Sequence, residues 1–415
     1  MKETLEQFYN ALLGVESPWE VASISRDSET KTVTAYVIHS SEDQLLCPDC
    51  STVGKLYDHR TRKWRHLDSC NHITMIEASV PRVDCPIHGV KQLPVPWAEK
   101  NSRFTVEFES AVLLWLKEDP ISTVAKNFGI SWDVVDGIMS RAVKRGLARR
   151  EISEPAHIGI DETAYQKRHE YVTVILDKDK DVVLDILDDR KAETLDEWFK
   201  TQKTARFTGV QSISMDMWDP FIKAVNNNFD NADNLIAFDK FHVAQHFNKA
   251  VDKVRARENG AYQKHGDFNP LKRTKYNWLR NSNKTDNRAT KRREFMKLTQ
   301  LNLKTARAWR IKEAASLLWD YTYMGVAIRE WKKLLGWISR CQLEPVKKVG
   351  KMIRRYFWGI LNAIRLKANN SMLEAKNSRI QKIKRMACGF RNRKRFKNAI
   401  MFHLGGLDMR HFATR

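Results

Sequence analysis

The sequence predicts a multidomain protein of the α/β class, and three observations carry this prediction. The chain has 415 residues, more than one ordinary domain needs, and 42% of them are apolar, enough for several cores. Two short pairs of metal-binding residue types stand near the N-terminus. Strand-like and helix-like patterns alternate between residues 157 and 257, and a long Trp-rich helical stretch follows. We therefore expect a metal-binding module, a helical module and an α/β unit with a helical insertion.

The charge of the chain is strongly positive. It carries 72 Lys and Arg against 50 Asp and Glu, a net charge of +22. This excess favours a polyanionic partner, because each neutralised phosphate releases condensed counterions. Ribosome or anionic-membrane contacts fit the same charge. No run of 18 uncharged apolar residues is present, and the opening "MKETLEQFYN" lacks the layout of a signal peptide. We expect a cytoplasmic protein associated with the nucleoid, without a membrane partner.

The metal-binding pairs are "CPDC" at 47–50 and "CPIH" at 85–88. Two knuckles of this form can surround one tetrahedral Zn²⁺ with four protein ligands, which leaves no position for water and makes the ion structural. The proline after each first Cys bends the chain, and the segment 72–85 between the knuckles alternates like a hairpin arm. The expected zinc ribbon lies within residues 1–98, with ligands Cys47, Cys50, Cys85 and His88.

Other readings of the cysteines stay open. The four residues could be unrelated thiols with His88 in a surface turn. Cys70 is a spare thiol that could replace one ligand. Cys341 and Cys388 lie within apolar helical patterns, where we expect them to be buried. Six cysteines in a cytosolic chain do not indicate a disulfide framework.

A helix-turn-helix is predicted within residues 99–150. In the segment 121–140, Ala125 allows close helix packing, Gly129 supplies the turn, and Ser131 is a natural N-cap. Val124, Phe128, Ile130, Val135 and Ile138 form an interior face, and an earlier helix over 105–118 completes three helices. A helical bundle without a DNA function would share this pattern. The residues expected at DNA are Ser131, Trp132, Asp133, Arg141 and Lys144.

The α/β pattern begins with three alternating runs joined by short polar links, which predict an antiparallel meander. The runs cover 157–165, 170–177 and 181–189. A helix over 191–202, a strand over 210–218, a helix over 219–229, a strand over 234–242 and another helix follow. This order is that of a ribonuclease-H-like fold. We assign its first part to residues 151–254.

The fold order places acids together. Asp161 is central to the first strand and Asp216 ends the fourth, and these strands lie side by side in such a sheet. Carboxylates this close need a cation, and hard oxygen ligands suit Mg²⁺ in a two-metal site. Glu374 is the favoured third acid, since its helix turns Leu373, Ile380, Ile383 and Ala387 inward. Glu344 is disfavoured by Pro345, and Glu313, Asp320 and Glu330 remain candidates.

Four motifs together resemble bacterial insertion-sequence DDE transposases of the ISL-three-type family. They are "GIDE" at 159–162, "SMDMWDPF" at 214–221, "AFDKFHV" at 237–243 and "LEAKNSRIQKIKRMACGFRN" at 373–392. The paired knuckles and the helix-turn-helix extend the resemblance over nearly the whole chain. Lys240 stands where the family signature has Arg, and His88 where a fourth Cys is expected.

The resemblance implies a metal-dependent DNA transposase that binds terminal inverted repeats, cleaves one strand at each end and transfers it. It implies Asp161, Asp216 and Glu374 as the triad that holds catalytic Mg²⁺ or Mn²⁺, supported by Asp239, His242, Asn377 and Arg385. Pairing of two ends implies a dimer or larger active complex. Two alternatives are a domesticated, non-cutting DNA-binding regulator and a structure-selective nuclease such as a Holliday-junction resolvase.

Residues 255–355 separate the acids and are helical, basic and rich in Trp, which predicts an all-α insertion domain. Its tryptophans are more often core than base-stacking groups. We expect 264–294 to be a flexible DNA-contacting loop or partly disordered. Residues 356–415 are expected to supply the final core helix and a basic tail. The tail residues expected at phosphate are Arg391, Arg393, Lys394 and Arg395.

Overall fold

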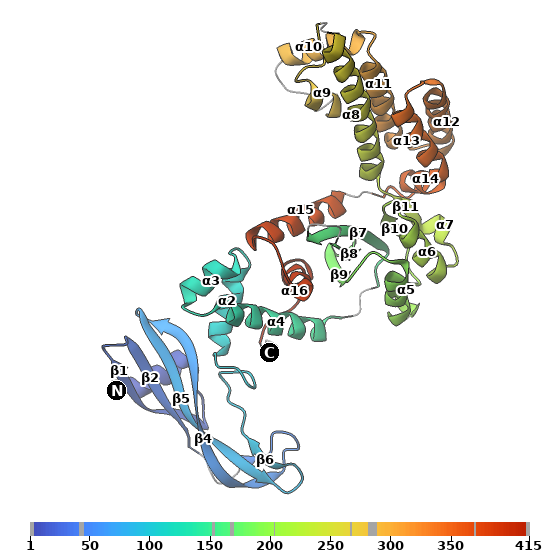
Figure 1. Ribbon diagram of the computed structural model, residues 1–415. Helices are drawn as coiled ribbons and strands as arrows, with labels where there is room; N and C mark the ends of the chain where they lie inside the picture. Colours follow the sequence, from blue (N-terminus) through green and yellow to red (C-terminus); the bar gives the residue numbers. More distant parts are fainter. Residues whose placement is uncertain are drawn as a thin grey trace. The chain divides into compact units, whose positions relative to one another are not determined.

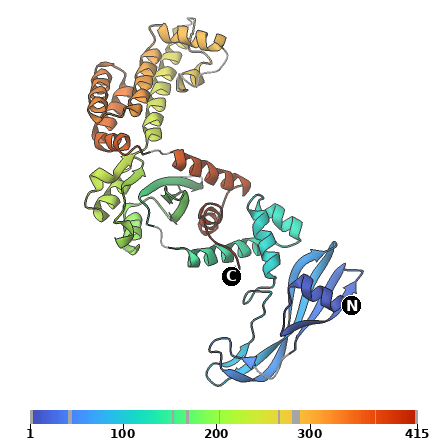
Figure 2. The same cartoon turned by 180° about the vertical axis from the view of Figure 1, so that it is seen from behind.

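The computed structural model describes residues 4–40, 45–151, 154–166, 170–202, 204–265, 268–280, 289–368 and 371–411 (Figure 1; Figure 2 from behind). The chain forms two compact units. The first contains the residues up to Arg150 and the C-terminal segment from Leu407, and the second runs from Glu151 to Gly406. Within the described parts, every helix is too short or too polar to span a lipid bilayer.

The first unit contains a six-stranded sheet, of which the sequence predicted only one hairpin. Its strands are β1 (Trp19–Asp27), β2 (Thr32–His39), β3 (Leu45–Leu46), β4 (Val53–Ser69), β5 (His72–Cys85) and β6 (Gly89–Gln92). The order is β1-β2-β5-β4-β3, and β6 pairs with the end of β5. The long β4–β5 hairpin confirms the predicted arm. Helix α1 (Leu5–Leu13) packs on β1, and Trp19, Trp64 and Trp97 meet edge to face in the core.

Three helices follow in the first unit and confirm the predicted helix-turn-helix. They are α2 (Val106–Leu116), α3 (Ile121–Phe128) and α4 (Trp132–Arg149). Gly129 ends α3 with φ +63°, a conformation that favours glycine, and the Ser131 hydroxyl accepts the Val134 N–H to begin α4. Val124, Val135 and Ile138 are fully buried between the helices. The basic segment 141–149 continues α4 to its end at Arg149.

The second unit is built on a five-stranded mixed sheet. Its strands are β7 (His157–Gln166), β8 (Glu170–Asp177), β9 (Val182–Leu187), β10 (Ser212–Met215) and β11 (Ile236–Phe238), in the order β11-β10-β7-β8-β9. The first three strands are antiparallel, which confirms the meander, and β10 and β11 run parallel to β7. The connecting helices are α5 (Ala192–Thr201), η1 (Thr204–Phe207), α6 (Asp219–Asn228) and α7 (Ala232–Leu235).

The two faces of β7 have different environments. Ile158 and Ile160 point into a core shared with Trp198 and Phe221 of α5 and α6. The intervening residues face the other way, because side chains alternate along a strand. A Cβ on Gly159 would lie 2.8 Å from Leu373 Cδ2, so the absence of a side chain lets α15 (Ser371–Met386) approach this face closely. Figures 1 and 2 show α15 beside β7, and α16 (Arg393–Leu404) packs on β9.

A helical insertion separates β11 from α15. Its helices are α8 (Lys240–His265), α9 (Lys275–Leu279), α10 (Ala289–Gln300), α11 (Lys304–Leu317), α12 (Met324–Arg340), α13 (Glu344–Arg355) and α14 (Phe357–Arg365), with the short η3 (Leu318–Asp320). Trp278, Trp309 and Trp331 are buried, as the core interpretation predicts. Trp337 is 41% exposed, so it is not a core residue.

Several local predictions were wrong. Cys388 is exposed and Cys341 is only half-buried, because both follow the ends of their helices rather than lying within them. Ala387 is exposed for the same reason. The described part of the segment 264–294 is more ordered than a flexible loop, since it contains α9 and the start of α10 with Trp278 fully buried. Residues 266–267 and 281–288 lie outside the described residues, and the DNA contact predicted for this segment stays a prediction.

Candidate active site and metal centres

Three acids occupy equivalent register positions on, or directly after, the three neighbouring parallel strands; we call this set the register row. Ser214 of β10 pairs with Gly159 of β7 and with Ala237 of β11. Continuing this register by two residues sets Asp161, Asp216 and Asp239 side by side. Side chains in one row of a parallel sheet project to the same face. The row therefore brings Asp161 and Asp216 together as predicted, and adds Asp239.

Asp161 is a buried carboxylate with two hydrogen-bond donors. It is 8% exposed, its Oδ1 accepts the Glu162 N–H at 2.7 Å, and its Oδ2 accepts the Asn377 amide at 2.5 Å. Burial raises the pKa of the Asp161 carboxyl to about 6, although His242 and the hydrogen bonds act in the opposite direction. Burial therefore favours the protonated carboxyl, and a cation beside Asp161 would favour the ionised form.

His242 lies between the other two acids. Its Nδ1 is 3.4 Å from Asp216 Oδ2, and its Nε2 is 3.8 Å from Asp239 Oδ2. Asp239 is 4% exposed and begins α8, where its Oδ1 accepts the Phe241 N–H at 2.7 Å. The Asp216 Oδ1 accepts the Met217 N–H at 2.6 Å. Backbone donors and the imidazole thus fix the direction of both carboxylates.

Helix α15 presents Asn377 and Glu374 on one side. Asn377 contacts Asp161 directly, and Glu374 stands three residues earlier, one helical turn nearer the helix N-terminus. Glu374 and Arg385 are both exposed. Among the described residues, the triad acids do not form a group with one oxygen from each within 4.8 Å of the others. The register row brings Asp161 and Asp216 together, whereas Glu374 is placed only by its position on α15, one turn from Asn377.

Neighbouring acids have structural roles. Glu162 points to the opposite face of β7 and pairs with Arg190 at 3.0 Å. Asp219 is the first residue of α6, and its carboxylate accepts hydrogen bonds from Arg355 and Tyr356, both at 2.8 Å. Asp177 accepts the backbone N–H groups of Asp179 and Lys180 in the β8–β9 turn. None of these three carboxylates belongs to the row.

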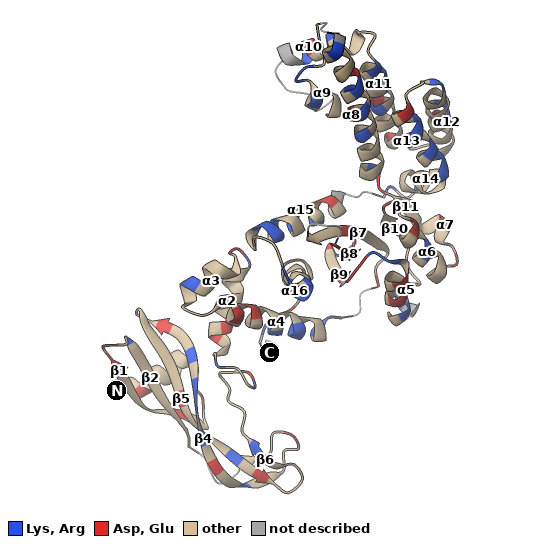
Figure 3. Ribbon diagram, viewed as in Figure 1, with Lys and Arg blue, Asp and Glu red and all other residues tan. Residues whose placement is uncertain are grey.

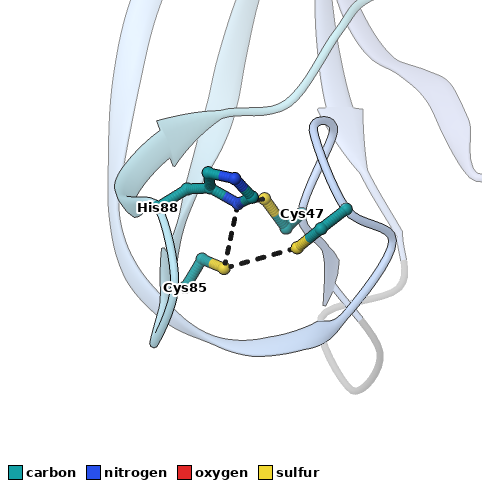
Figure 4. A group of neighbouring side chains, drawn as sticks. Cys47, Cys85 and His88 are labelled. Atoms are coloured by element: carbon teal, nitrogen blue, oxygen red, sulfur yellow. Dashed lines mark hydrogen bonds between the residues drawn. The ribbon is translucent and has the colours of Figure 1, made fainter.

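The two cysteine knuckles meet at one point in the first unit. Cys50 Sγ lies 3.7 Å from Cys85 Sγ, and His88 Nδ1 lies 3.8 Å from Cys47 Sγ and 3.9 Å from Cys85 Sγ. Figure 4 shows Cys47, Cys85 and His88 turned toward one another. Hydrogen bonds from Thr52 lower the pKa of the Cys50 thiol to about 6, which favours the thiolate.

This group fits a tetrahedral zinc ion. With Zn–S bonds of about 2.3 Å, sulfur atoms at two corners of a tetrahedron lie about 3.8 Å apart. The observed separations match this edge, and all four ligand atoms lie within 4.8 Å of one another. Cys70 is exposed at the opposite end of the β4–β5 hairpin and is not in the group. The structure therefore excludes Cys70 as the replacement ligand.

The predicted DNA-contacting residues of the helix-turn-helix lie at the start of α4 and along it. Ser131, Trp132, Asp133 and Lys144 are exposed. Arg141 is different, because its guanidinium pairs with the buried Glu109 at 2.5 Å. Among the basic residues near the C-terminus, Arg393 lies 3.6 Å from Glu170 and stacks over Tyr165, whereas Arg391 and Lys394 are exposed and Arg395 is half-buried.

The first unit also contains an ionic cluster that was not predicted from the sequence. The C-terminal segment from Leu407, which the sequence prediction placed in one unit with residues 356–406, belongs to the first unit. It packs on α4, where the Arg145 guanidinium donates to the Met409 carbonyl. His411 lies 3.1 Å from Glu99 and 3.7 Å from Glu109. Arg141 and Arg145 already neutralise these carboxylates, so the cluster binds the chain end rather than a metal. No local signal in the sequence could reveal it.

Two residues near the acidic row were also missed. Lys178 donates to the Ser214 hydroxyl at 2.8 Å, and burial lowers the pKa of the Lys178 ammonium. His246 lies one helical turn after His242, and burial lowers its pKa while the nearby Asp216 raises it. The i, i+4 spacing of the two histidines was visible in the sequence and could have indicated His246.

Comparison with known proteins agrees with the order of these modules. Residues 43–88 match the model described as the zinc-finger of transposase IS204/IS1001/IS1096/IS1165. Residues 93–143 match the helix-turn-helix domain of transposase family ISL3. Residues 158–400 match the ISL3 DDE model described as transposase.

Relatives align over most of their length. The chain is 26% identical over 434 aligned positions, covering 96% of both chains, to a transposase for insertion sequence element IS1557 from Mycobacterium tuberculosis. It is 23% identical to the transposase for insertion sequence element IS1001 from Bordetella parapertussis, covering 88% of this chain and 90% of that protein. Since the transposase model alone spans more than half of the chain, the protein belongs to the ISL3 family of insertion-sequence transposases and is a DNA transposase of the DDE class.

Proposed function

We propose that Asp161, Asp216 and Glu374 form the catalytic triad of this transposase, on a ribonuclease-H-like core. The observation that carries the proposal is the register row, which joins Asp161 to Asp216 across adjacent parallel strands. The strand order and the antiparallel meander support the fold assignment. Glu374 is supported by its position one turn from Asn377, which donates to Asp161.

The donor set of the site fits divalent cations. Carboxylate oxygens are hard ligands that suit Mg²⁺ or Mn²⁺, and the buried Asp161 gains most from a neighbouring positive charge. When bound, a pair of such ions activates the attacking oxygen and stabilises the leaving oxygen. Asn377 holds the Asp161 carboxylate in one orientation, and His242 does the same for Asp216. Asp239 supports the site by holding His242 from its other side.

The remaining modules serve DNA binding in this proposal. Residues 1–98, with zinc held by Cys47, Cys50, Cys85 and His88, and residues 99–150 recognise the terminal inverted repeats. The exposed start of α4 is the expected major-groove contact. Residues 151–254 and 356–415 supply the core, and 255–355 the insertion. Joining two ends requires at least a dimer, working on DNA in the cytoplasm.

A nicking assay tests the proposal. The substrate is a duplex that carries the inverted repeat read from DNA bracketing the gene, with Mg²⁺ or Mn²⁺ supplied. Wild-type protein should cleave one strand at the repeat boundary, and the Asp161→Asn or Asp216→Asn variant should bind the same duplex without cleaving it. Full cleavage by either variant rejects the triad. A wild-type protein that binds the repeat but never cleaves would instead match the non-cutting regulator.

A further inference from the structure

A basic groove runs between α8 and α13 in the second unit. It encloses about 330 Å³ and is lined by His246, Lys249, Lys253 and Arg257 of α8 and by Lys348 and Met352 of α13. Ala250 and Val349 are buried and form part of its apolar floor. Figure 3 shows basic residues recurring along both helices. The groove is concave with cations on both sides, unlike a convex, solvated helix face.

The cations of α8 form a stripe that begins at the acidic row. Asp239 precedes α8 directly, and His242, in the first turn, lies 3.4 Å from Asp216. Counting from His242, the residues His246, Lys249, Lys253 and Arg257 follow at spacings of four, three, four and four residues, which keeps them on one side of a helix. At 1.5 Å per residue, the stripe from His242 to Arg257 is about 22 Å long.

The cations that line this groove lack acidic partners among the residues that the structure describes. Among the described residues, no carboxylate lies within ion-pair distance of Lys249, Lys253, Arg257 or Lys348. Neighbouring cations do have partners: Arg255 and Lys275 both pair with Asp252. Glu344 lines the far end of the groove and lies 3.7 Å from Lys347. The groove is therefore lined by four cations for which the described residues supply no carboxylate within ion-pair distance.

We propose that the α8–α13 groove binds the phosphodiester backbone of DNA adjacent to the strand-cleavage site. This proposal rests on the proposed function, because the row of cations begins beside the acids that we propose to be catalytic. A row of cations that leads away from the reacting phosphate neutralises successive phosphates of one strand. The apolar floor supports sugars without reading bases, so binding is independent of sequence.

The test compares two charge-matched variants of the full-length protein. The groove variant carries Lys249→Gln, Lys253→Gln and Arg257→Gln. The control carries Lys223→Gln, Lys297→Gln and Lys332→Gln, which removes three exposed cations outside the groove. The salt dependence of affinity is measured on a duplex with the element end and flanking DNA. Three lost phosphate contacts lower the slope of log K against log salt by about 2.7, at about 0.9 per contact.

Ethylation interference locates the contacts. Ethylation of phosphates next to the cleaved bond should weaken binding of the wild type and the control but not of the groove variant, while interference at the distal repeat stays the same in all three. Duplexes shortened on the element side or the flanking side identify which DNA occupies the groove. Equal slopes and equal interference patterns for both variants would overturn the inference. Failure of the wild-type protein to cleave the duplex would instead contradict the proposed function.

Discussion

The two predicted metal sites of this protein differ in how complete they are without an ion. The Cys47–Cys50–Cys85–His88 group has its ligand atoms near the corners of a tetrahedron. The Asp161–Asp216–Glu374 group has one buried and two accessible acids that do not close around a point. A structural ion is held by protein alone, whereas a catalytic ion needs room for substrate oxygens. Among the described residues, the cysteine–histidine group is closed, as a structural site requires, whereas the proposed catalytic acids leave room for substrate.

The largest effect is expected at the closed site. Cys85→Ser removes a central ligand, and structural zinc contributes about 10–16 kcal/mol in small zinc modules. We expect loss of bound zinc, cooperative unfolding of the zinc ribbon and loss of specific DNA binding. The zinc content of the purified variant measures the loss of zinc, and its circular dichroism measures the unfolding. Cys70→Ser is the matched control and should keep zinc; equal zinc loss in both variants would show that the assigned ligands are incorrect.

At the open site, Asp161→Asn should separate activity from stability. Cleavage should fall by at least a thousandfold, because a metal ligand is lost. The folded-state pKa of Asp161 is about 6, above its ordinary value of 3.8, so folding favours the protonated form. The metal-free wild type therefore loses stability as the pH rises from about 4 to about 6, by roughly 2–3 kcal/mol.

Thermal unfolding in EDTA across this pH range measures the stability effect. The Asp161→Asn variant should melt above the wild type at pH 7 and converge with it near pH 4. A wild-type pH profile that the substitution leaves unchanged would contradict the buried, cation-requiring carboxylate. Glu162→Gln, on the opposite face of β7, is the control and should retain cleavage.

A smaller effect is expected from the residue that orients Asp161. Asn377→Ala removes the hydrogen bond to Oδ2 but no ligand, and the loss of such outer partners lowers metal affinity by about 10–100-fold. Cleavage should recover when Mn²⁺ is raised, so the apparent metal constant shifts more than the maximal rate. Gln381→Ala, one turn later and bonded to Thr163, should leave the metal constant unchanged. A defect that no metal concentration relieves would argue that Asn377 contacts DNA instead.

The parts of the fold that depend on short-range signals could be predicted from the sequence. The knuckles at 47–50 and 85–88 fix ligands within three residues, and Gly129 and Ser131 mark the end of one helix and the start of the next. Alternation along 157–187 defines the meander and sets Asp161 and Glu162 on opposite faces. These features depend on backbone conformations and periodicities that each segment carries by itself.

The remaining features depend on contacts between distant segments. Arg145 binds the Met409 carbonyl, 264 residues later, and no pattern near either residue indicates that pair. The β1–β2 hairpin was missed, and its pairing with β5 joins residues about forty positions apart. Cys388 was misjudged because its positive φ of 52° ends the helix before the apolar pattern ends. The close approach of Leu373 to Gly159, which sets α15 beside β7, joins two segments far apart in the sequence, and local periodicity does not encode it.

Iron-directed cleavage of the polypeptide tests the central claim most directly. Fe²⁺ replaces the divalent ions, and ascorbate with peroxide then generates hydroxyl radicals that cut the backbone beside the bound metal. With zinc retained and repeat DNA bound, we predict cuts near residues 161, 216 and 374, all suppressed by excess Mg²⁺ and by Asp161→Asn. Cuts at the first two positions without the third would contradict Glu374 as a ligand. Cuts elsewhere that Mg²⁺ suppresses would contradict the site itself.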